Sequence, residues 1–400
     1  EIRLAATRAL AARVKLGILL DGSEYDGISP LENDTDAHDA MARLAAQKSM
    51  VLLKNDGVLP LDLNRLGTVA VIGPNATSIR CLEGNYNGSS SRYVTFLQGI
   101  RNACEGKARV LYAEGSDICR EKPDSLSQPD HRLAEAVQAA KDADAVILCL
   151  GLDGSLEGEE GDASNAFASG DKRDLELPEV QRRLISAVLA TDKPTVTVVA
   201  AGSALRVEEG NAVLYAWYPG QAGGTALADL LFGAVSPSGK LPLTFYHSVE
   251  DLPSFEDYHM AGRTYRYFTG EPLYPFGYGL SYTRFAFENA AYRDGVVAVT
   301  VRNAGQRDAE AVVEVYAQPD ASPYATPNPS LCAFTRVMLK AGEARRIELP
   351  LGKHAFTVVN DEGERVSGGT GYTLYVGDSQ PDARSVALAG QAPVTIRVAL

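Results

Sequence analysis

Four carboxylates crowd the seven-residue stretch LEGEEGD: Glu157, Glu159, Glu160 and Asp162. The stretch follows an apolar run at residues 145–150 (AVILCL), which is typical of a buried parallel strand. Open α/β sheets bind their ligands just beyond the carboxyl ends of such strands. Like charges this close disfavour full ionisation, so at least one carboxyl is expected to stay protonated near neutral pH for general-acid catalysis. An acidic loop exposed to water would have the same composition. Other segments of the chain are therefore needed to distinguish a catalytic loop from an exposed one.

The bulk composition is that of a globular chain with more than one domain. Its 400 residues exceed the usual size of a single domain, and its 45% hydrophobic and 22% charged residues are ordinary fractions. The formal net charge of −13 argues against nucleic acid or an anionic membrane surface as a partner, whereas a neutral ligand such as a sugar is compatible with it. No apolar run approaches the roughly 18 residues that a membrane span requires.

The cysteines and histidines form no metal-binding pattern. The five cysteines lie apart without a CxxC pair and the five histidines are dispersed, so neither a metal nor a cofactor is expected. Cys149 lies within the apolar run and is interpreted as an inert core thiol. One bridge among Cys81, Cys104 and Cys119 is left open, and the odd number of cysteines leaves the redox compartment undecided.

Apolar strand-like runs alternate with helical ones between residues 48 and 240. The expected strands are residues 50–53, 68–72, 110–113, 145–150, 195–200 and 212–217. The expected helices between them are residues 94–103, 133–141, 179–190 and 224–232. Alternating elements with continuously hydrophobic strands imply a mostly parallel sheet that helices cover on both faces.

The first 47 residues do not belong to this alternating pattern. Residues 2–15 are expected to form a helix that Gly17 ends, and residues 34–48 a second, amphipathic helix. A helix as short as the first is marginal alone, and nothing nearby in the sequence offers it a packing partner. We therefore expect residues 1–47 to be the end of an upstream domain plus a linker, and the chain to be a fragment.

The composition changes twice after the alternating region. Residues 241–284 are rich in proline, glycine and aromatic residues, which predicts an ordered strap packed across domain surfaces. Residues 285–400 show the period-two alternation of strands, separated by NAG, KAGE and NDEG turns. This pattern predicts a seven-stranded antiparallel sandwich, with six of its strands at residues 296–302, 311–317, 334–339, 345–349, 372–377 and 393–398.

Several segments occur in the order that characterises one family. They are VLLKNDGVLPL (51–61), AVIGPNA (70–76), LEGNYNG (82–88), the LEGEE loop with GDKRDLELPEVQ (170–181), AWYPGQAGGTALADLLFG (216–233), GKLPLTF (239–245), GRTYRYF (262–268) and YPFGYGLSYT (274–283). With these segments the chain closely resembles glycoside hydrolase family 3, which contains β-glucosidases, β-xylosidases and relatives. The resemblance covers essentially all 400 residues.

The resemblance implies a retaining exo-glycosidase made of three parts. An N-terminal (β/α)8 barrel carries the aspartate nucleophile, an α/β sandwich supplies the acid/base glutamate, and a fibronectin III-like domain closes the C-terminus. This chain matches the last two parts, and residues 1–17 resemble the last helix of the barrel. No nucleophile motif is found in this chain, because Ser116-Asp117 lies in the sandwich domain and is rejected.

The resemblance also places the acid/base residue. The family's Ser-Gly-Glu-Gly and Glu-Ala-Glu patterns, placed on LEGEE, point to Glu159, with Glu160 and Glu157 as the alternatives. In relatives an aromatic residue on the loop at 82–88 flanks the +1 subsite, so Tyr86 is a candidate for stacking on a sugar and Asn85 for bonding sugar hydroxyls. A tyrosine that packs on the protein and an asparagine that forms a turn are the structural alternatives.

The expected substrate is a terminal, non-reducing β-D-xylosyl residue, as in xylan degradation, with β-D-glucosidase activity as the alternative within the family. A non-catalytic carbohydrate-binding or assembly subunit is the alternative of another class. The expected partners are small oligosaccharides or aryl and alkyl β-glycosides, and the N-terminal barrel domain of the same protein. Nucleic acid and membranes are not expected as partners, and a homodimer is left open. The substrate class and the family's frequent export indicate a periplasmic or secreted location.

Overall fold

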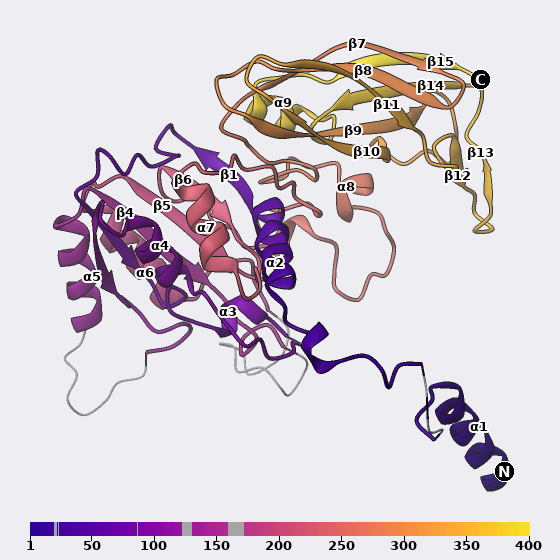
Figure 1. Ribbon diagram of the computed structural model, residues 1–400. Helices are drawn as coiled ribbons and strands as arrows, with labels where there is room; N and C mark the ends of the chain where they lie inside the picture. Colours follow the sequence, from indigo (N-terminus) through magenta and orange to yellow (C-terminus); the bar gives the residue numbers. More distant parts are fainter. Residues whose placement is uncertain (20–21, 23, 86, 122–129, 159–171) are drawn as a thin grey trace. The chain divides into compact units, whose positions relative to one another are not determined.

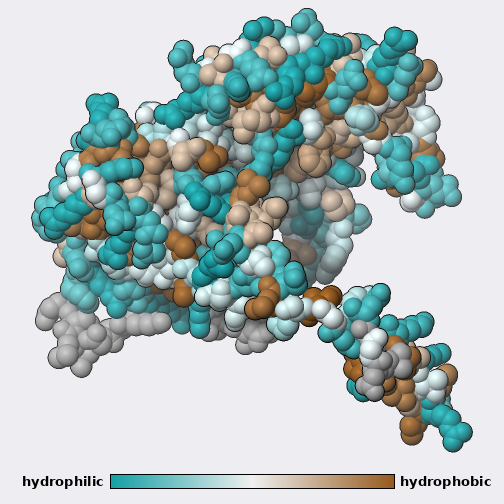
Figure 2. All heavy atoms as spheres, viewed as in Figure 1, coloured by the Kyte–Doolittle hydropathy of each residue, from teal (hydrophilic) through white to brown (hydrophobic). Residues whose placement is uncertain are grey.

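The computed structural model describes residues 1–19, 22, 24–85, 87–121, 130–158 and 172–400. These residues divide into two compact units, residues 1–41 and residues 42–400. The first unit contains helix α1 (Ile2–Lys15) and the short 3-10 helix η1 (Pro30–Glu32) (Figure 1). No residue of α1 is buried, and hydrophobic side chains lie on its surface (Figure 2). The helix predicted at residues 2–15 is confirmed, and within the described part of its unit nothing buries its apolar side chains.

A six-stranded sheet forms the centre of the second unit and follows helix α2 (Asp36–Ser49). Its strands are β1 (Val51–Asn55), β2 (Thr68–Ile72), β3 (Arg109–Ala113), β4 (Ala145–Gly151), β5 (Thr195–Ala200) and β6 (Ala212–Tyr215). They lie in the order β1-β6-β5-β4-β2-β3. Strand β1, at one edge, pairs antiparallel with β6, and the other pairs are parallel. The mostly parallel sheet predicted from the alternating pattern is therefore confirmed.

Helices cover both faces of this sheet (Figure 1). One face carries α5 (His131–Lys141) and α6 (Glu179–Leu189), and the other carries α3 (Arg80–Glu83), α4 (Phe96–Cys104) and α7 (Gly223–Leu231). All seven residues of β4 are buried, since alternate side chains enter opposite cores. Helices α4 and α7 touch so closely that a Cβ on Gly99 would clash with the backbone of Gly224, so this contact requires glycine.

Residues 241–284 run as a strap along the second unit and include η2 (Val249–Asp251) and α8 (Thr264–Tyr267). The backbone N–H groups of Leu241 and Phe245 donate to the carbonyls of Tyr278 and Tyr274, each over 2.9 Å. The rings of Phe245, Tyr274 and Tyr278 lie in the core beneath the sheet face that α5 and α6 cover. Burial of these three rings accounts for part of the aromatic composition of the strap, whereas Phe255 and Tyr258 are exposed.

The C-terminal region is a β-sandwich with one added hairpin and one added helix. A four-stranded sheet contains β9 (Ala309–Pro319), β10 (Ser330–Leu339), β14 (Gly371–Gly377) and β15 (Val394–Ala399), and a three-stranded sheet contains β7 (Phe285–Arg293), β8 (Val296–Asn303) and β11 (Ala344–Pro350). These seven antiparallel strands confirm the predicted sandwich. The hairpin of β12 (Thr357–Val359) and β13 (Arg365–Ser367) and the helix α9 (Ala383–Ala389) are additional elements that the pattern did not predict.

All five cysteines lie in the described part of the chain and are free thiols. Cys149 is fully buried in the sheet core, which confirms its interpretation as a core thiol, and no bridge joins Cys81, Cys104 and Cys119. Burial raises the pKa of the Cys81 and Cys332 thiols to about 12. Among the described helices, none combines the length and the apolar character that crossing a membrane would take.

A buried carboxyl group, that of Glu314 on β9, lies where the sandwich meets the strap. The Tyr316 hydroxyl donates to its Oε2 over 2.6 Å, and a Cβ on Gly277 of the strap would clash with the same oxygen. Two charged groups act on it from other segments: Lys240 favours its ionisation and Asp378 opposes it. Burial outweighs both and raises the pKa of the Glu314 carboxyl from its ordinary value of 4.5 to about 7.

Replacing Glu314 with glutamine is expected to stabilise the protein at pH 8 but not at pH 4. At pH 4, below both the ordinary pKa of 4.5 and the folded value, the carboxyl is mostly neutral in the folded and the unfolded chain. As pH rises from the unfolded pKa to the folded pKa, the Glu314 carboxyl loses its proton in the unfolded chain but keeps it in the folded chain. The free energy of unfolding of the wild type therefore falls over this range, by up to about 3 kcal/mol. Denaturant unfolding at both pH values measures the difference, with the exposed Glu364→Gln as control. An equal effect of Glu314→Gln at both pH values would contradict the prediction.

Candidate active site

The candidate site lies at the edge of the sheet where the central parallel strands end. Strands β6, β5 and β4 are neighbours, so the segments that follow them meet at this edge. The segment after β2 also reaches it: the Asn75 N–H donates to the carbonyl of Cys149 over 3.2 Å, and the Asn75 side chain donates to the carbonyl of Leu152 over 2.9 Å. The start of the loop after β4 is therefore fixed by its neighbour in the sheet.

Gln181 of α6 fixes the end of β4 from the other side. Its side-chain oxygen accepts from the N–H of Gly151 over 2.8 Å, and its amide nitrogen donates to the carbonyl of Gly151 over 2.7 Å. The same nitrogen donates to the carbonyl of Ile118 over 2.6 Å, and the side chain is fully buried. The pair of hydrogen bonds with Gly151 gives Gln181, the glutamine of the LPEVQ segment, a structural role next to the acidic loop.

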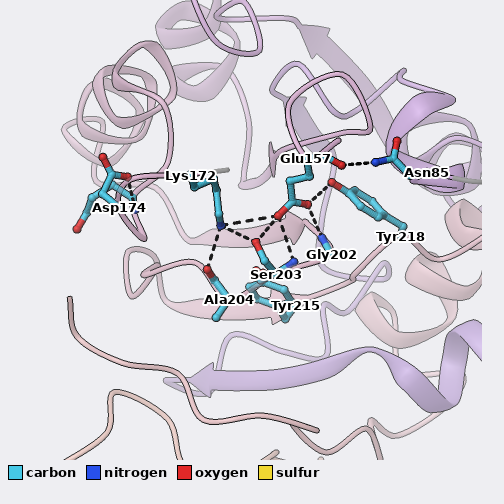
Figure 3. A network of polar contacts seen from close by, with 10 residues as sticks. Asn85, Glu157, Lys172, Asp174, Gly202, Ser203, Ala204, Tyr215 and Tyr218 are labelled. Atoms are coloured by element: carbon cyan, nitrogen blue, oxygen red, sulfur yellow. Dashed lines mark hydrogen bonds and ion pairs between the residues drawn. The ribbon is translucent and has the colours of Figure 1, made fainter. Parts of the chain in front are cut away.

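The turn that leads into the acidic residues is organised by Asp153. Its carboxylate accepts from the N–H of Ser155 over 2.9 Å and from the Ser155 hydroxyl over 2.6 Å. Its backbone carbonyl accepts from the N–H groups of Leu156 and Glu157 over 2.9 and 3.0 Å. The chain therefore turns back over the sheet edge, and the Glu157 carboxylate enters the space between the ends of β5 and β6 (Figure 3).

Glu157 is an anchored carboxylate. It accepts hydrogen bonds from the N–H of Gly202 over 2.7 Å, from the N–H of Ser203 over 3.2 Å, and from the hydroxyls of Ser203 and Tyr218 (Figure 3). Its side chain is 12% exposed. Burial and the Glu157 charge together raise the pKa of Tyr218 well above its ordinary value, so the tyrosine remains a donor. Both carboxylate oxygens are thus occupied by donors from the ends of β5 and β6.

Lys172 brings the far end of the acidic segment to the same cluster. Its Nζ lies 3.7 Å from Glu157 Oε1 and donates to the Ser203 hydroxyl over 2.5 Å and to the Ala204 carbonyl over 3.2 Å. Burial lowers the pKa of Lys172, and the Glu157 charge opposes this shift. Residues 158 and 172, which flank the undescribed residues 159–171, are therefore both tied to Glu157. We call Glu157, Lys172, Gly202, Ser203 and Tyr218 the anchor cluster.

Comparison with known proteins identifies the family. The sequence model described as the glycosyl hydrolase family 3 C-terminal domain matches residues 50–282, and that of the fibronectin type III-like domain matches residues 311–380. The chain belongs to glycosyl hydrolase family 3. The first match includes every residue of the anchor cluster, so the cluster lies within the family's own domain.

Relatives within family 3 have been named for two sugars. A periplasmic β-glucosidase of Salmonella typhimurium is 35% identical, with 90% of this chain and 52% of the relative covered. A β-xylosidase of Formosa agariphila is 33% identical, with 96% and 54% covered. The crystal structure of a Bifidobacterium adolescentis family 3 β-glucosidase matches with a TM-score of 0.77 and 34% identity, with 93% and 55% covered. The chain spans about half the length of the curated relatives it matches.

The residues predicted from the sequence fall into two groups. Glu159, Glu160 and Tyr86 lie outside the described residues, and their roles stay predictions. Asn85 donates its side-chain amide to the backbone carbonyl of Glu157, so it holds the acidic loop in this structure. Asp117, rejected as a nucleophile, accepts a hydrogen bond from Arg132 over 2.8 Å.

Sequence reasoning missed the partners of Glu157, although a signal for them exists. Gly202 and Ser203 follow the predicted strand at 195–200, and Tyr218 follows the predicted strand at 212–217. In a parallel sheet the ends of neighbouring strands lie at one edge, so polar residues directly after two such strands are candidates for contact with the acidic loop.

Proposed function

We propose that this family 3 chain supplies the acid/base residue of a retaining exo-β-glycosidase, and that Glu159 is that residue. The observation that carries the proposal is the anchor cluster, which holds Glu157 and Lys172 at the carboxyl edge of the sheet. Glu159 lies two residues after Glu157 in the sequence. A group that transfers protons must be held in position relative to the glycosidic bond.

The role of Glu159 in such a reaction has two halves. In the first, the nucleophile attacks the anomeric carbon, the glycosidic bond breaks, and Glu159 gives its proton to the departing oxygen. In the second, the Glu159 carboxylate takes a proton from water while the water oxygen attacks the anomeric carbon and releases the nucleophile. The carboxyl therefore begins and ends the cycle protonated, and the sugar keeps its anomeric configuration.

The contacts of Glu157 support a different role for that alternative. Its carboxylate accepts bonds from two backbone N–H groups and two hydroxyls, and it lies next to the Lys172 ammonium. A carboxylate whose two oxygens are filled by donors of its own protein has no free position from which to give a proton to a substrate. We assign Glu157 to positioning, and Glu160 remains the alternative proton donor.

We further propose that the nucleophile lies on an N-terminal barrel domain of the same protein. The proposed substrates are glycosides with a terminal β-D-xylosyl residue. β-D-Glucosyl residues are the alternative, since relatives of both names match the chain to similar extents. Small oligosaccharides and alkyl or aryl β-glycosides are the substrate forms. A periplasmic or secreted location is part of the proposal and agrees with the name of the Salmonella relative.

Hydrolysis assays on two forms of the protein, with and without the barrel, test this division of labour. The protein that includes the barrel is expected to hydrolyse 4-nitrophenyl β-D-xyloside with a higher kcat/KM than the matching glucoside, whereas the 400-residue chain alone hydrolyses neither. A higher kcat/KM for the glucoside would change the substrate assignment and leave the mechanism intact. Turnover by the isolated chain, or none by the complete protein, would contradict the proposal.

A further inference from the structure

A cavity of about 330 Å³ lies between α8 of the strap and the C-terminal sandwich. Arg266 and Tyr267 of α8 form one side, and residues of β9, β10, β14 and the β12–β13 hairpin form the rest. Its volume lies within the roughly 300–1,000 Å³ typical of small-molecule sites. No residue of the anchor cluster, and no described residue of the loop after β4, lines it. We call it the basic pocket, because of the charges described next.

The charges around this pocket are all of one sign. Arg266, Lys353, Arg365 and the titratable His354 line it, and no described aspartate or glutamate does, although the chain carries a net charge of −13. Within the described part of the chain, none of the three permanent cations forms an ion pair. One nitrogen of Arg365 donates to the Thr357 hydroxyl over 3.2 Å, which leaves its other N–H groups available. Three cations that have no carboxylate partner among the described residues make this an anion-binding environment.

The pKa of His354 indicates that Arg365 and Lys353 are close enough to affect the same imidazole ring. The pKa of its imidazole is lowered by desolvation first, and then by repulsion from Arg365 and Lys353. His354 is therefore neutral at pH 7 and can accept or donate a hydrogen bond. An anion bound beside it would offset the repulsion, which provides a local reporter of occupancy.

The remaining lining favours a ring-shaped anion over a simple inorganic one. Tyr267 and Tyr324 line the pocket together with apolar residues such as Leu331 and Val358. Aromatic and apolar surfaces contact the apolar face of a pyranose ring, and they give no advantage to an isolated phosphate ion. We propose that the basic pocket binds a sugar that carries a carboxylate, such as a uronic acid residue, with Arg266 and Arg365 as the carboxylate-binding residues.

Binding measurements with matched sugars test this proposal. The complete protein carrying Glu159→Ala is titrated with methyl β-D-glucuronide, methyl β-D-glucoside and inorganic phosphate, by calorimetry and by NMR of the His354 ring. The glucuronide is expected to bind about tenfold or more tightly than the neutral glucoside, as one charged hydrogen-bonded contact implies. It should also raise the pKa of His354, whereas the glucoside leaves it unchanged. Because binding is measured in a variant without the acid/base residue, the result does not depend on the proposed activity.

Two sets of variants decide whether the pocket is responsible. The double variant Arg266→Ala/Arg365→Ala should weaken glucuronide binding about tenfold or more, and Tyr324→Ala should weaken it less. The control is Arg346→Ala on β11, an exposed arginine of the same domain that does not line the pocket, and it should bind like the parent. Equal affinity for the glucuronide and the glucoside, an unaltered affinity in the double variant, or phosphate binding as tight as the glucuronide would each overturn the proposal.

Discussion

Replacing Glu159 with alanine in the complete protein is expected to lower kcat/KM for alkyl β-glycosides by about 10²–10⁴-fold, the usual contribution of general-acid catalysis. An alkoxide is a poor leaving group, so breaking its glycosidic bond requires a proton, which we propose that Glu159 supplies. For 4-nitrophenyl glycosides the leaving group needs little protonation, so kcat/KM should fall much less. Their kcat should still fall, because the second step loses its base. A series of aryl glycosides of graded leaving-group pKa measures this dependence.

Sodium azide provides the decisive second readout for this variant. Azide attacks the glycosyl-enzyme without the help of a base, so it should restore kcat for the nitrophenyl substrate and give the β-glycosyl azide as product. Glu160→Ala is the matched control, because it removes a neighbouring carboxylate of the same loop. If Glu160→Ala shows the leaving-group dependence and the azide rescue instead, the proton donor lies one residue further along the chain.

Replacing Glu157 with alanine is expected to lower the free energy of unfolding by about 1–3 kcal/mol, as leaving partly buried hydrogen-bond donors unsatisfied does. The change leaves the Tyr218 hydroxyl and the N–H groups of Gly202 and Ser203 without this acceptor, and it removes the carboxylate beside the Lys172 ammonium. Donors that are partly shielded from water are costly to leave unpaired. Denaturant unfolding of the complete protein, followed by circular dichroism, measures the difference.

The control for Glu157 is Glu179→Ala, which removes a carboxylate that is 66% exposed and paired with Arg182. Exposed pairs contribute about 0–1 kcal/mol, so this variant should unfold almost like the wild type. Glu157→Ala should also lose activity towards both alkyl and nitrophenyl glycosides, without rescue by azide. Azide rescue of Glu157→Ala would show that Glu157 is itself the proton donor. A free energy of unfolding equal to that of the wild type would show that Glu157 does not anchor the loop.

The parallel sheet was predictable because burial on both faces produces a strong signal. Strands β2 and β5 begin and end at the predicted residues 68–72 and 195–200. In contrast, the pattern does not give a range for β7, whose Glu288 and Asn289 lie at a bulge where Asn289 has a positive φ. Helix α9 was also missed, although Asp382 caps its first turn and Gly390 follows its end. Its seven residues are too few for the helical period to stand out.

The site was predictable in its location but not in its internal contacts. The run of carboxylates after an apolar strand pointed to the carboxyl edge of the sheet, which is where Glu157 lies. Which carboxylate would be anchored depends on the order β6-β5-β4, since this order brings Ser203 and Tyr218 within reach of it. The chain carries no local signal for that order, because the three strands are similar hydrophobic runs. The order of the strands in the sheet, rather than the composition of the loop, therefore determines that Glu157 is the anchored carboxylate.

The burial of the free thiols affects how the protein responds to its redox environment. Thiol–disulfide exchange needs a thiolate, and burial raises the pKa of Cys81 and Cys332 to about 12 and that of Cys149 further still. At neutral pH these three sulfur atoms therefore carry very little thiolate. The five cysteines form no disulfide, so the fold does not depend on a covalent cross-link between them, and reducing agents are not expected to weaken it.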